Sequence, residues 1–277
     1  MRAVANSLPK SGTHLLTRLL DLIGMTEGPL HLSGSLVRLT SRNPIRMLQI
    51  ARRRTRRSYS DGLNVDLDEP KNVLRGRWLR QKLARTPVNA YFQAHLPHSD
   101  DLEAFLAENN LKLLFIIRDP RDVLLSFVNH MLRDPSFPFH RQFHSMSSTE
   151  ARLRATLEGC IGDRGIPLAS LPNRLARVMG WYRSKQTLTV RFEDLIGPQG
   201  AGLAQRQRQT VRRVCDHMQF DFSEQRLDEI ASSVFNTRAS TFHKGQIGTW
   251  KEAFTPTIER MFADACGPYI RQLGYDY

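Results

Sequence analysis

The chain has 277 residues, of which 40% are hydrophobic and 24% charged, and its formal net charge is +13. These values exclude a chain that is disordered throughout and are typical of one large α/β domain or two small ones. The three cysteines, Cys160, Cys215 and Cys266, are far apart and odd in number, which argues against a disulfide framework and a structural zinc site.

In the first half of the chain, strands are predicted to alternate with helices. Spacing and turn residues predict strands at 2–8, 88–94 and 111–117, a turn at 9–12, and helices at 13–24, 75–85, 99–109 and 119–132. Between them, segment 38–60 is strongly basic and segment 62–71 is acidic and rich in turn residues.

The second half begins with an irregular segment, 134–149, that is rich in Phe, His and Pro and is predicted to form a loop over a site. Helices at 149–158, 171–184, 205–218, 223–234 and from about 256, a strand at 187–192 and a loop at 197–202 complete the prediction. The pattern predicts a single α/β domain over residues 1–277, a central parallel β-sheet flanked by helices that binds its ligand at the carboxyl ends of the strands.

The charge and the apolar runs bear on partners and location. The excess of positive charge predicts an anionic ligand, a polyanion or an acidic membrane surface. No apolar run approaches the roughly 18 residues needed to span a bilayer, and no secretory signal is visible. We therefore expect a cytoplasmic protein.

The turn at 9–14, Pro-Lys-Ser-Gly-Thr-His, leads directly from a strand into a helix. The first backbone N–H groups of such a helix and its dipole favour a phosphate or sulfate group. Gly12 permits close approach of the backbone, Lys10 adds a charge, and Ser11 and Thr13 add hydroxyl donors. The alternative interpretation of this segment alone is an ordinary strand-to-helix turn.

Two further motifs carry positive charge. Arg118 follows an apolar strand, and a guanidinium at a strand end can form two hydrogen bonds to one phosphate. Ser126 lies about two helical turns further on. Lys244 and Gly245 lie in an irregular segment and can wrap a phosphate, with Gly248 following. Taken singly, the first could also be a helix start with surface charge pairs and the second a solvated basic loop.

In order and spacing, the three motifs together resemble the superfamily of sulfotransferases that use 3′-phosphoadenosine 5′-phosphosulfate (PAPS). The resemblance spans nearly the whole chain. It implies a P-loop-like strand-loop-helix that binds the phosphosulfate group, and PAPS as co-substrate with no metal. The residues that it implies for nucleotide binding are Lys10, Ser11, Gly12, Thr13, His14, Arg118, Ser126, Phe192, Phe235, His243, Lys244 and Gly245.

The resemblance also implies the catalytic residues. His95, in a His-Leu-Pro segment after the second predicted strand, matches the histidine base of the cytosolic branch, and a histidine can accept the proton of an acceptor hydroxyl at neutral pH. Lys10 and Ser126 complete the implied catalytic set, in which Lys10 stabilises charge on the transferring sulfuryl group. Without the family, His95 is an ordinary loop histidine.

This sequence departs from the family pattern at several positions. The family's lysine before the histidine is Gln93, its adenine-stacking tryptophan is Leu15, a tyrosine is Phe192, and the arginine before Lys-Gly is His243. These changes predict altered contacts to adenine and to the 3′-phosphate. The family's dimerisation pattern is not intact, because Pro256 and Arg260 disagree with it.

The acceptor is expected to be a small-molecule, lipid or glycan hydroxyl. Its pocket is assigned to segments 28–85 and 134–149, because such loops vary most within a fold. His98 is considered as an acceptor contact. His140 and His144 are interpreted as pocket wall or packing, because no third ligand completes a metal site.

Two other functions are weighed. A P-loop kinase for a small molecule would need the Walker glycine spacing, which the first motif lacks. A nucleic-acid or membrane-binding module would need a basic stripe with interleaved aromatic residues, but the arginines cluster at 52–57 and no nucleic-acid partner is expected. That run is interpreted as a solvated face, with a contact to an acidic acceptor or to anionic lipid headgroups as the alternative.

Overall fold

The computed structural model describes residues 1–33, 36–39, 55–56, 60–69, 73–162, 165–235 and 246–276, with backbone alone at 33, 36–39 and 55–56. The predicted nucleotide-binding residues His243, Lys244 and Gly245 lie outside these ranges. The arginine run at 52–57 also lies outside these ranges, except that the backbone of 55–56 is described.

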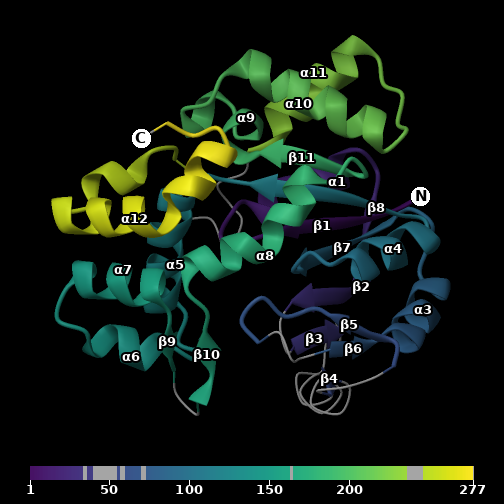
Figure 1. Cartoon of the computed structure of the whole chain (residues 1–277). Helices are drawn as coiled ribbons and strands as arrows, with labels where there is room; N and C mark the ends of the chain where they lie inside the picture. The colour runs from purple at the N-terminus through teal and green to yellow at the C-terminus, as the bar shows by residue number, and fades with distance from the viewer. Residues whose placement is uncertain are drawn as a thin grey trace.

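A twisted six-stranded sheet forms the centre of the molecule (Figure 1). Its order is β11-β8-β1-β7-β2-β3, and every neighbouring pair is parallel except β2 with β3. The strands are β1 (Arg2–Ser7), β2 (Thr26–Ser33), β3 (Leu36–Leu39), β7 (Ala90–His95), β8 (Leu111–Ile117) and β11 (Thr187–Arg191). The predicted central parallel sheet flanked by helices is confirmed.

Helices and two small antiparallel sheets surround this centre. The small sheets consist of β4 (Thr55–Arg56), β5 (Gly62–Asn64) and β6 (Val73–Arg75), and of β9 (Cys160–Ile161) and β10 (Pro167–Leu168). The α-helices are α1 (Thr13–Leu22), α3 (Gly76–Ala84), α4 (Asp100–Glu108), α5 (Pro120–Arg133), α6 (His140–Ser145), α7 (Thr149–Glu158), α8 (Leu171–Arg183), α9 (Phe192–Leu195), α10 (Ala204–His217), α11 (Glu224–Val234) and α12 (Pro256–Gln272). Short 3₁₀ turns span η2 (Pro198–Gly200) and η3 (Thr249–Glu252).

Both faces of the sheet are buried, by different helices. Val4 of β1 packs in a core with residues of α4, α5, α8 and α12, whereas Ala3 and Ala5 pack in a second core with α1, α10 and α11. The alternation follows from the strand period, in which successive side chains point to opposite faces. β8, which is apolar at six of its seven positions in Leu-Lys-Leu-Leu-Phe-Ile-Ile, is buried on both faces, as expected for a central parallel strand.

Two sequence-based predictions were wrong. The sheet contains a strand that the sequence did not reveal, β2, because Gly28 and Pro29 interrupt its apolar pattern and its pairing with β7 shifts register between Glu27 and His31. The start of segment 28–85 is therefore part of the central sheet. Segment 134–149 is not irregular throughout, because it contains α6.

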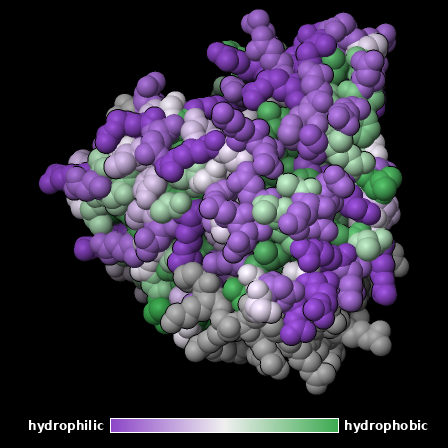
Figure 2. All heavy atoms as spheres, turned by 45° about the vertical axis from the view of Figure 1, so that its right-hand side comes forward, coloured by the Kyte–Doolittle hydropathy of each residue, from purple (hydrophilic) through white to green (hydrophobic). Residues whose placement is uncertain are grey.

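The outer surface agrees with the high charge of the chain. Hydrophilic residues dominate the face shown in Figure 2, with hydrophobic residues scattered among them. Among the described residues, no helix combines the length and the apolar character that a bilayer span requires.

Candidate active site

A cavity of about 1220 Å³ opens where the parallel strands end. Its walls include Lys10 after β1, His95 at the end of β7, Arg118 after β8 and Phe192 after β11. Parallel strands bring their carboxyl ends to one edge of a sheet, so segments far apart in the sequence meet here. This is the location that the sequence predicted.

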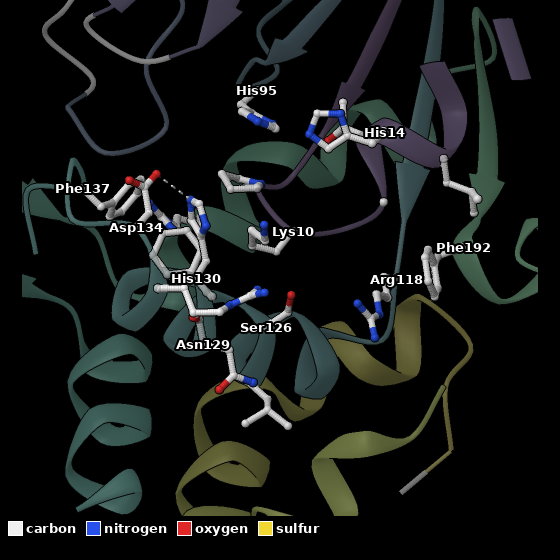
Figure 3. A pocket seen from close by; sticks show the side chains of 18 of the residues that line it. Lys10, His14, His95, Arg118, Ser126, Asn129, His130, Asp134, Phe137 and Phe192 are labelled. Carbon is white, nitrogen blue, oxygen red and sulfur yellow. Dashed lines mark hydrogen bonds and ion pairs between the residues drawn. The ribbon is translucent and has the colours of Figure 1, made fainter. Parts of the chain in front are cut away.

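The cavity has two ends, with Lys10 in the middle (Figure 3). Arg118 and Phe192 lie toward one end, which we call the Arg118 end, and His130 and Phe137 lie toward the other, which we call the Phe137 end. His95 points into the space near Lys10.

The loop between β1 and α1 is tightly constrained. Gly12 precedes α1 with φ 101°, and a Cβ atom there would lie 2.5 Å from Cδ2 of Phe192. A glycine is therefore required both by the backbone and by the close approach of the ring. Ser11 is buried, and the hydroxyls of Ser7 and Thr13 are hydrogen-bonded at 2.6 Å. The predicted strand-loop-helix is present, and Gly12, Thr13 and His14 at the start of α1 line the cavity.

Lys10 has a perturbed environment. Burial, together with the charges of Arg133 and Arg118, lowers its pKa to about 8. Its backbone φ is 73°, which is unusual for a residue with a side chain. Desolvated cations crowded in one place are stabilised by an anion, and the strained loop holds this ammonium group where such an anion would sit.

Arg118 is fixed from several sides. Its Nη2 donates to the carbonyl oxygen of Gln246 at 2.8 Å and lies 3.5 Å from the carboxylate of Asp122, while its guanidinium lies 4.4 Å from the centre of the Phe192 ring. Its Nε atom is buried and has no hydrogen-bond partner among the residues that the structure describes. A buried donor left unpaired is costly, so the Nε–H of Arg118 is available to donate a hydrogen bond to a ligand.

The buried carboxylate of Asp122 connects α5 to the C-terminal segment. It accepts hydrogen bonds from the N–H of Gly248 at 2.8 Å, the hydroxyl of Thr249 at 2.9 Å and the N–H of Trp250 at 3.1 Å. This contact brings Gly248, the described residue of the third sequence motif, to the helix that follows Arg118. The sequence analysis did not single out Asp122, although its position one turn after Arg118 was visible.

Ser126 lines the cavity from α5, and the same face carries residues that the sequence analysis missed. Asn129, His130 and Arg133 follow at intervals of one helical turn and also line the cavity. Burial and the charge of Lys10 lower the pKa of His130 to about 4. The helical period of α5 was a signal that could have found them.

His95 is held in a defined orientation. Its Nδ1 lies 2.9 Å from the carbonyl oxygen of Ser7, which can only accept, so Nδ1 carries the hydrogen and Nε2 carries the free electron pair. Burial lowers the pKa of His95 to about 3, and His31, Arg174 and His14 add to this effect. The ring is therefore a neutral imidazole whose unprotonated nitrogen is free to accept a proton.

The other histidines considered from the sequence have structural partners. His98 does not line the cavity: its Nε2 pairs with Glu103 at 2.9 Å, and its ring packs edge-on against Trp181. The interpretation of His98 as an acceptor contact is therefore wrong. His140 and His144 bind carbonyl oxygens of the last turn of α5, at 2.9 Å each.

Most of the other positions predicted to bind the nucleotide line the cavity, but Ser11 does not. His14, Phe192 and Phe235 line the cavity, as does Leu15 in the position of the family's tryptophan. Gln93 also faces it and donates to Glu27 at 3.0 Å.

The Phe137 end combines aromatic and charged side chains. Phe137, Phe139 and Leu168 line it, as do His130 and Asp134, whose side chains lie 4.0 Å apart. Asp68, which is paired with Arg174 through hydrogen bonds of 2.7 and 2.8 Å, also lines the cavity. Over the described residues, no three side chains of the metal-ligating types gather at one place.

A family model described as sulfotransferase domain matches residues 3–274. The chain therefore belongs to the sulfotransferase domain family. This confirms the class predicted from the three motifs, a PAPS-dependent sulfotransferase, and selects it over the kinase and the basic binding module.

Solved structures with the same fold are related at low sequence identity. Mouse sulfotransferase SULT7A1 complexed with PAP has 17% identity and a TM-score of 0.60, covering 98% of this chain and 84% of that chain. Retinol dehydratase in complex with androsterone and inactive cofactor PAP has 15% identity and a TM-score of 0.59, covering 100% of this chain and 82% of that chain. Retinol dehydratase with retinol and PAP has 15% identity and a TM-score of 0.57, covering 100% and 83%. No relative was found among curated proteins.

Proposed function

We propose that the Arg118 end of the cavity binds PAPS and that the Phe137 end binds the hydroxyl acceptor, with His95 as the general base between them. The backbone N–H groups of α1 and the ammonium group of Lys10 bind the 5′-phosphosulfate. Arg118 and Ser126, with Lys244 and Gly245, bind the 3′-phosphate. The constrained Gly12 turn and the orphaned Nε of Arg118 support this assignment.

The reaction is an in-line displacement at sulfur. The acceptor oxygen attacks the sulfur atom while its proton passes to Nε2 of His95, and the bond between sulfur and the bridging oxygen of the 5′-phosphate breaks. Lys10 and the N-terminus of α1 stabilise the charge that develops on that oxygen. The products are the sulfated acceptor and 3′-phosphoadenosine 5′-phosphate (PAP).

The observation that carries this assignment is the hydrogen bond between His95 and the carbonyl oxygen of Ser7. Ser7 is the last residue of β1, three residues before Lys10, so the base and the sulfate-binding loop are fixed to the same piece of backbone. A base must be held in position relative to both reactants, and this contact provides that constraint.

We propose an apolar alcohol as the acceptor, whether a phenol or a lipid-like alcohol. Phe137, Phe139 and Leu168 supply apolar surface at the proposed acceptor end. Phe137 and Phe139 belong to segment 134–149, and Leu67 and Asp68 to segment 28–85, which supports the assignment of the acceptor pocket to these segments. Retinol and androsterone, bound by proteins of the same fold, are apolar alcohols. We also propose a cytoplasmic location, which is supported by the three cysteines being free thiols.

The test begins with the wild-type protein. Calorimetry with PAP measures nucleotide binding, and a mass-spectrometric screen with PAPS detects the added sulfuryl mass on phenols, sterols, retinoid alcohols and sugars. An acceptor found in this way allows His95→Ala to be assayed, with His144→Ala, which lies on α6 away from the cavity wall, as the matched control.

We expect His95→Ala to lower kcat by about 10²- to 10⁴-fold and to bind PAP with unchanged affinity, while His144→Ala behaves as wild type. Because burial lowers the pKa of His95 to about 3 in the free enzyme, kcat/KM should not fall as the pH is lowered from 7 to 5. Full turnover of His95→Ala with intact PAP binding would remove His95 as the base.

A further inference from the structure

Arg18, on α1, is a cation in the cavity that the three motifs do not use. It lines the cavity, and its Nε atom is buried without a hydrogen-bond partner. Over the part of the chain that the structure describes, its guanidinium forms no ion pair. A charge that is partly desolvated and unpaired in the free protein costs stability. Arg18 therefore has the features of a group whose partner is a ligand.

The neighbours of Arg18 on α1 point to the Arg118 end, because Leu15 packs in the same hydrophobic cluster as Phe192 and Phe235. Residues 14 and 15 each lie about one turn before residue 18, and all three line the cavity. The C-terminal end of α11 reaches the same region, where Val234 and Phe235 line the cavity. The opposite end of α11 lies by the end of α1, where Arg226 donates to the carbonyl oxygen of Leu22.

The neighbours of Arg18 identify which part of the nucleotide it meets. Phosphate sites are built from several hydrogen-bond donors, and the proposed function places them at Lys10 and at Arg118. Arg18 instead follows Leu15 by one turn of α1, and Leu15, Val234 and Phe235 pack in one hydrophobic cluster that reaches the cavity wall. A single planar cation among apolar side chains fits the flat face of a purine base, since guanidinium groups stack on π-systems.

We propose that Arg18 binds the adenine of PAPS, with its guanidinium stacked on one face of the base and Phe235 on the other. This rests on the proposed function, because it assumes that the nucleotide occupies the Arg118 end. Leu15 has no ring to offer the base. Arg18, one turn further along α1, supplies the planar group, and it also gains the partner that it lacks in the free protein.

The test separates a planar stacking group from a simple charge. Arg18→Lys keeps the charge and removes the plane, and Arg18→Leu removes both. Each is titrated calorimetrically with PAP and with an analogue of PAP that has the same two phosphates on methyl riboside but no base. Arg271→Leu is the matched control, because Arg271 is an exposed arginine on α12 outside the cavity.

We expect Arg18→Lys to lower the affinity for PAP by about 5- to 100-fold, the usual range for one base-stacking contact, and to leave the affinity for the baseless analogue within about twofold. Arg18→Leu should lower PAP affinity at least as much, and Arg271→Leu should match wild type. Melting temperatures of all variants identify any that is misfolded, and Arg18→Lys is the conservative change on which the result depends.

Two results would overturn the stacking role. PAP affinity unchanged in both variants would mean that Arg18 does not touch the nucleotide. PAP affinity kept in Arg18→Lys, with PAP and the analogue weakened alike in Arg18→Leu, would mean that Arg18 acts only as a charge. Failure of the proposed function looks different, since wild type would then bind no PAP or would bind it equally well after Lys10→Ala.

Discussion

The Arg118 end of the cavity is formed by turns that directly follow parallel strands, whereas the Phe137 end is formed by the last turns of α5, the segment 134–139 that follows it, and β10 (Figure 1). At the Arg118 end the sheet fixes the backbone, and charged groups are held without full partners. At the Phe137 end charged side chains are paired with one another, as in Arg174 with Asp68 and His130 with Asp134. One end is thus prepared for an anion, and the other combines aromatic side chains with ion pairs inside the protein.

The largest expected effect is a loss of catalytic rate, and it tests the Arg118 end. Lys10→Ala should lower kcat by about 10²- to 10³-fold, because it removes a positioned cation from the developing charge on the leaving oxygen. Single-turnover assays with PAPS and an identified acceptor measure it. A loss that appears only in KM would show that Lys10 binds the ground state and the transition state equally.

Asp122 tests whether the Arg118 end depends on its buried connection to the C-terminal segment. Asp122→Asn should lower the free energy of unfolding by about 3 kcal/mol, since it leaves the charge of Arg118 without its buried partner, and should weaken PAP binding. Chemical denaturation measures the first effect. Asp216→Asn, at an exposed position on α10, is the control and should change stability very little.

The pH dependence of PAP binding tests the electrostatics of the same end. The pKa of Lys10 is lowered to about 8 in the free protein, and in the proposed function its protonated form binds the anion. Affinity should therefore be constant well below pH 8 and should fall above it, by up to about tenfold per pH unit. Calorimetry across this range is the measurement, and Lys10→Arg, which stays charged, should remove the dependence.

The smallest effect is expected at the Phe137 end. Phe137 packs at 5.0 Å from His130 and at 5.9 Å from Phe127, measured between ring centres. Phe137→Ala removes part of the apolar wall, so KM for an apolar acceptor should rise by about fivefold while PAP affinity stays unchanged. An equal loss of PAP affinity would show that the two ends are not separate.

Residues at the Arg118 end were predictable because their signals are local. The turn before α1, the apolar strand before Arg118 and the spacing to Ser126 can each be read in a few consecutive residues. Arg18 escaped notice because an arginine between leucines on an amphipathic helix is usually solvent-exposed. His31 was missed with its strand, since the Gly28-Pro29 pair hides the period of two on which strand prediction depends.

His95 and His98 show what the nearby sequence could not predict, namely which of the two rings faces the cavity. They are three residues apart after the same strand, and nothing within that segment determines which ring faces the cavity. The choice depends on residues remote in sequence: the carbonyl of Ser7 holds one ring, while Trp181 and Glu103 take the other. Only the family resemblance could separate them beforehand.

The sequence by itself determined the class of fold, the strand-turn-helix around Lys10 and the family, because each rests on short-range periodicity or on motifs in fixed order. The tertiary structure decided the protonation of His95, the lowered pKa of Lys10, the anchoring role of Asp122 and the gathering of aromatic side chains at the Phe137 end. These properties arise from burial and from contacts between distant segments, and neither exists until the chain has folded.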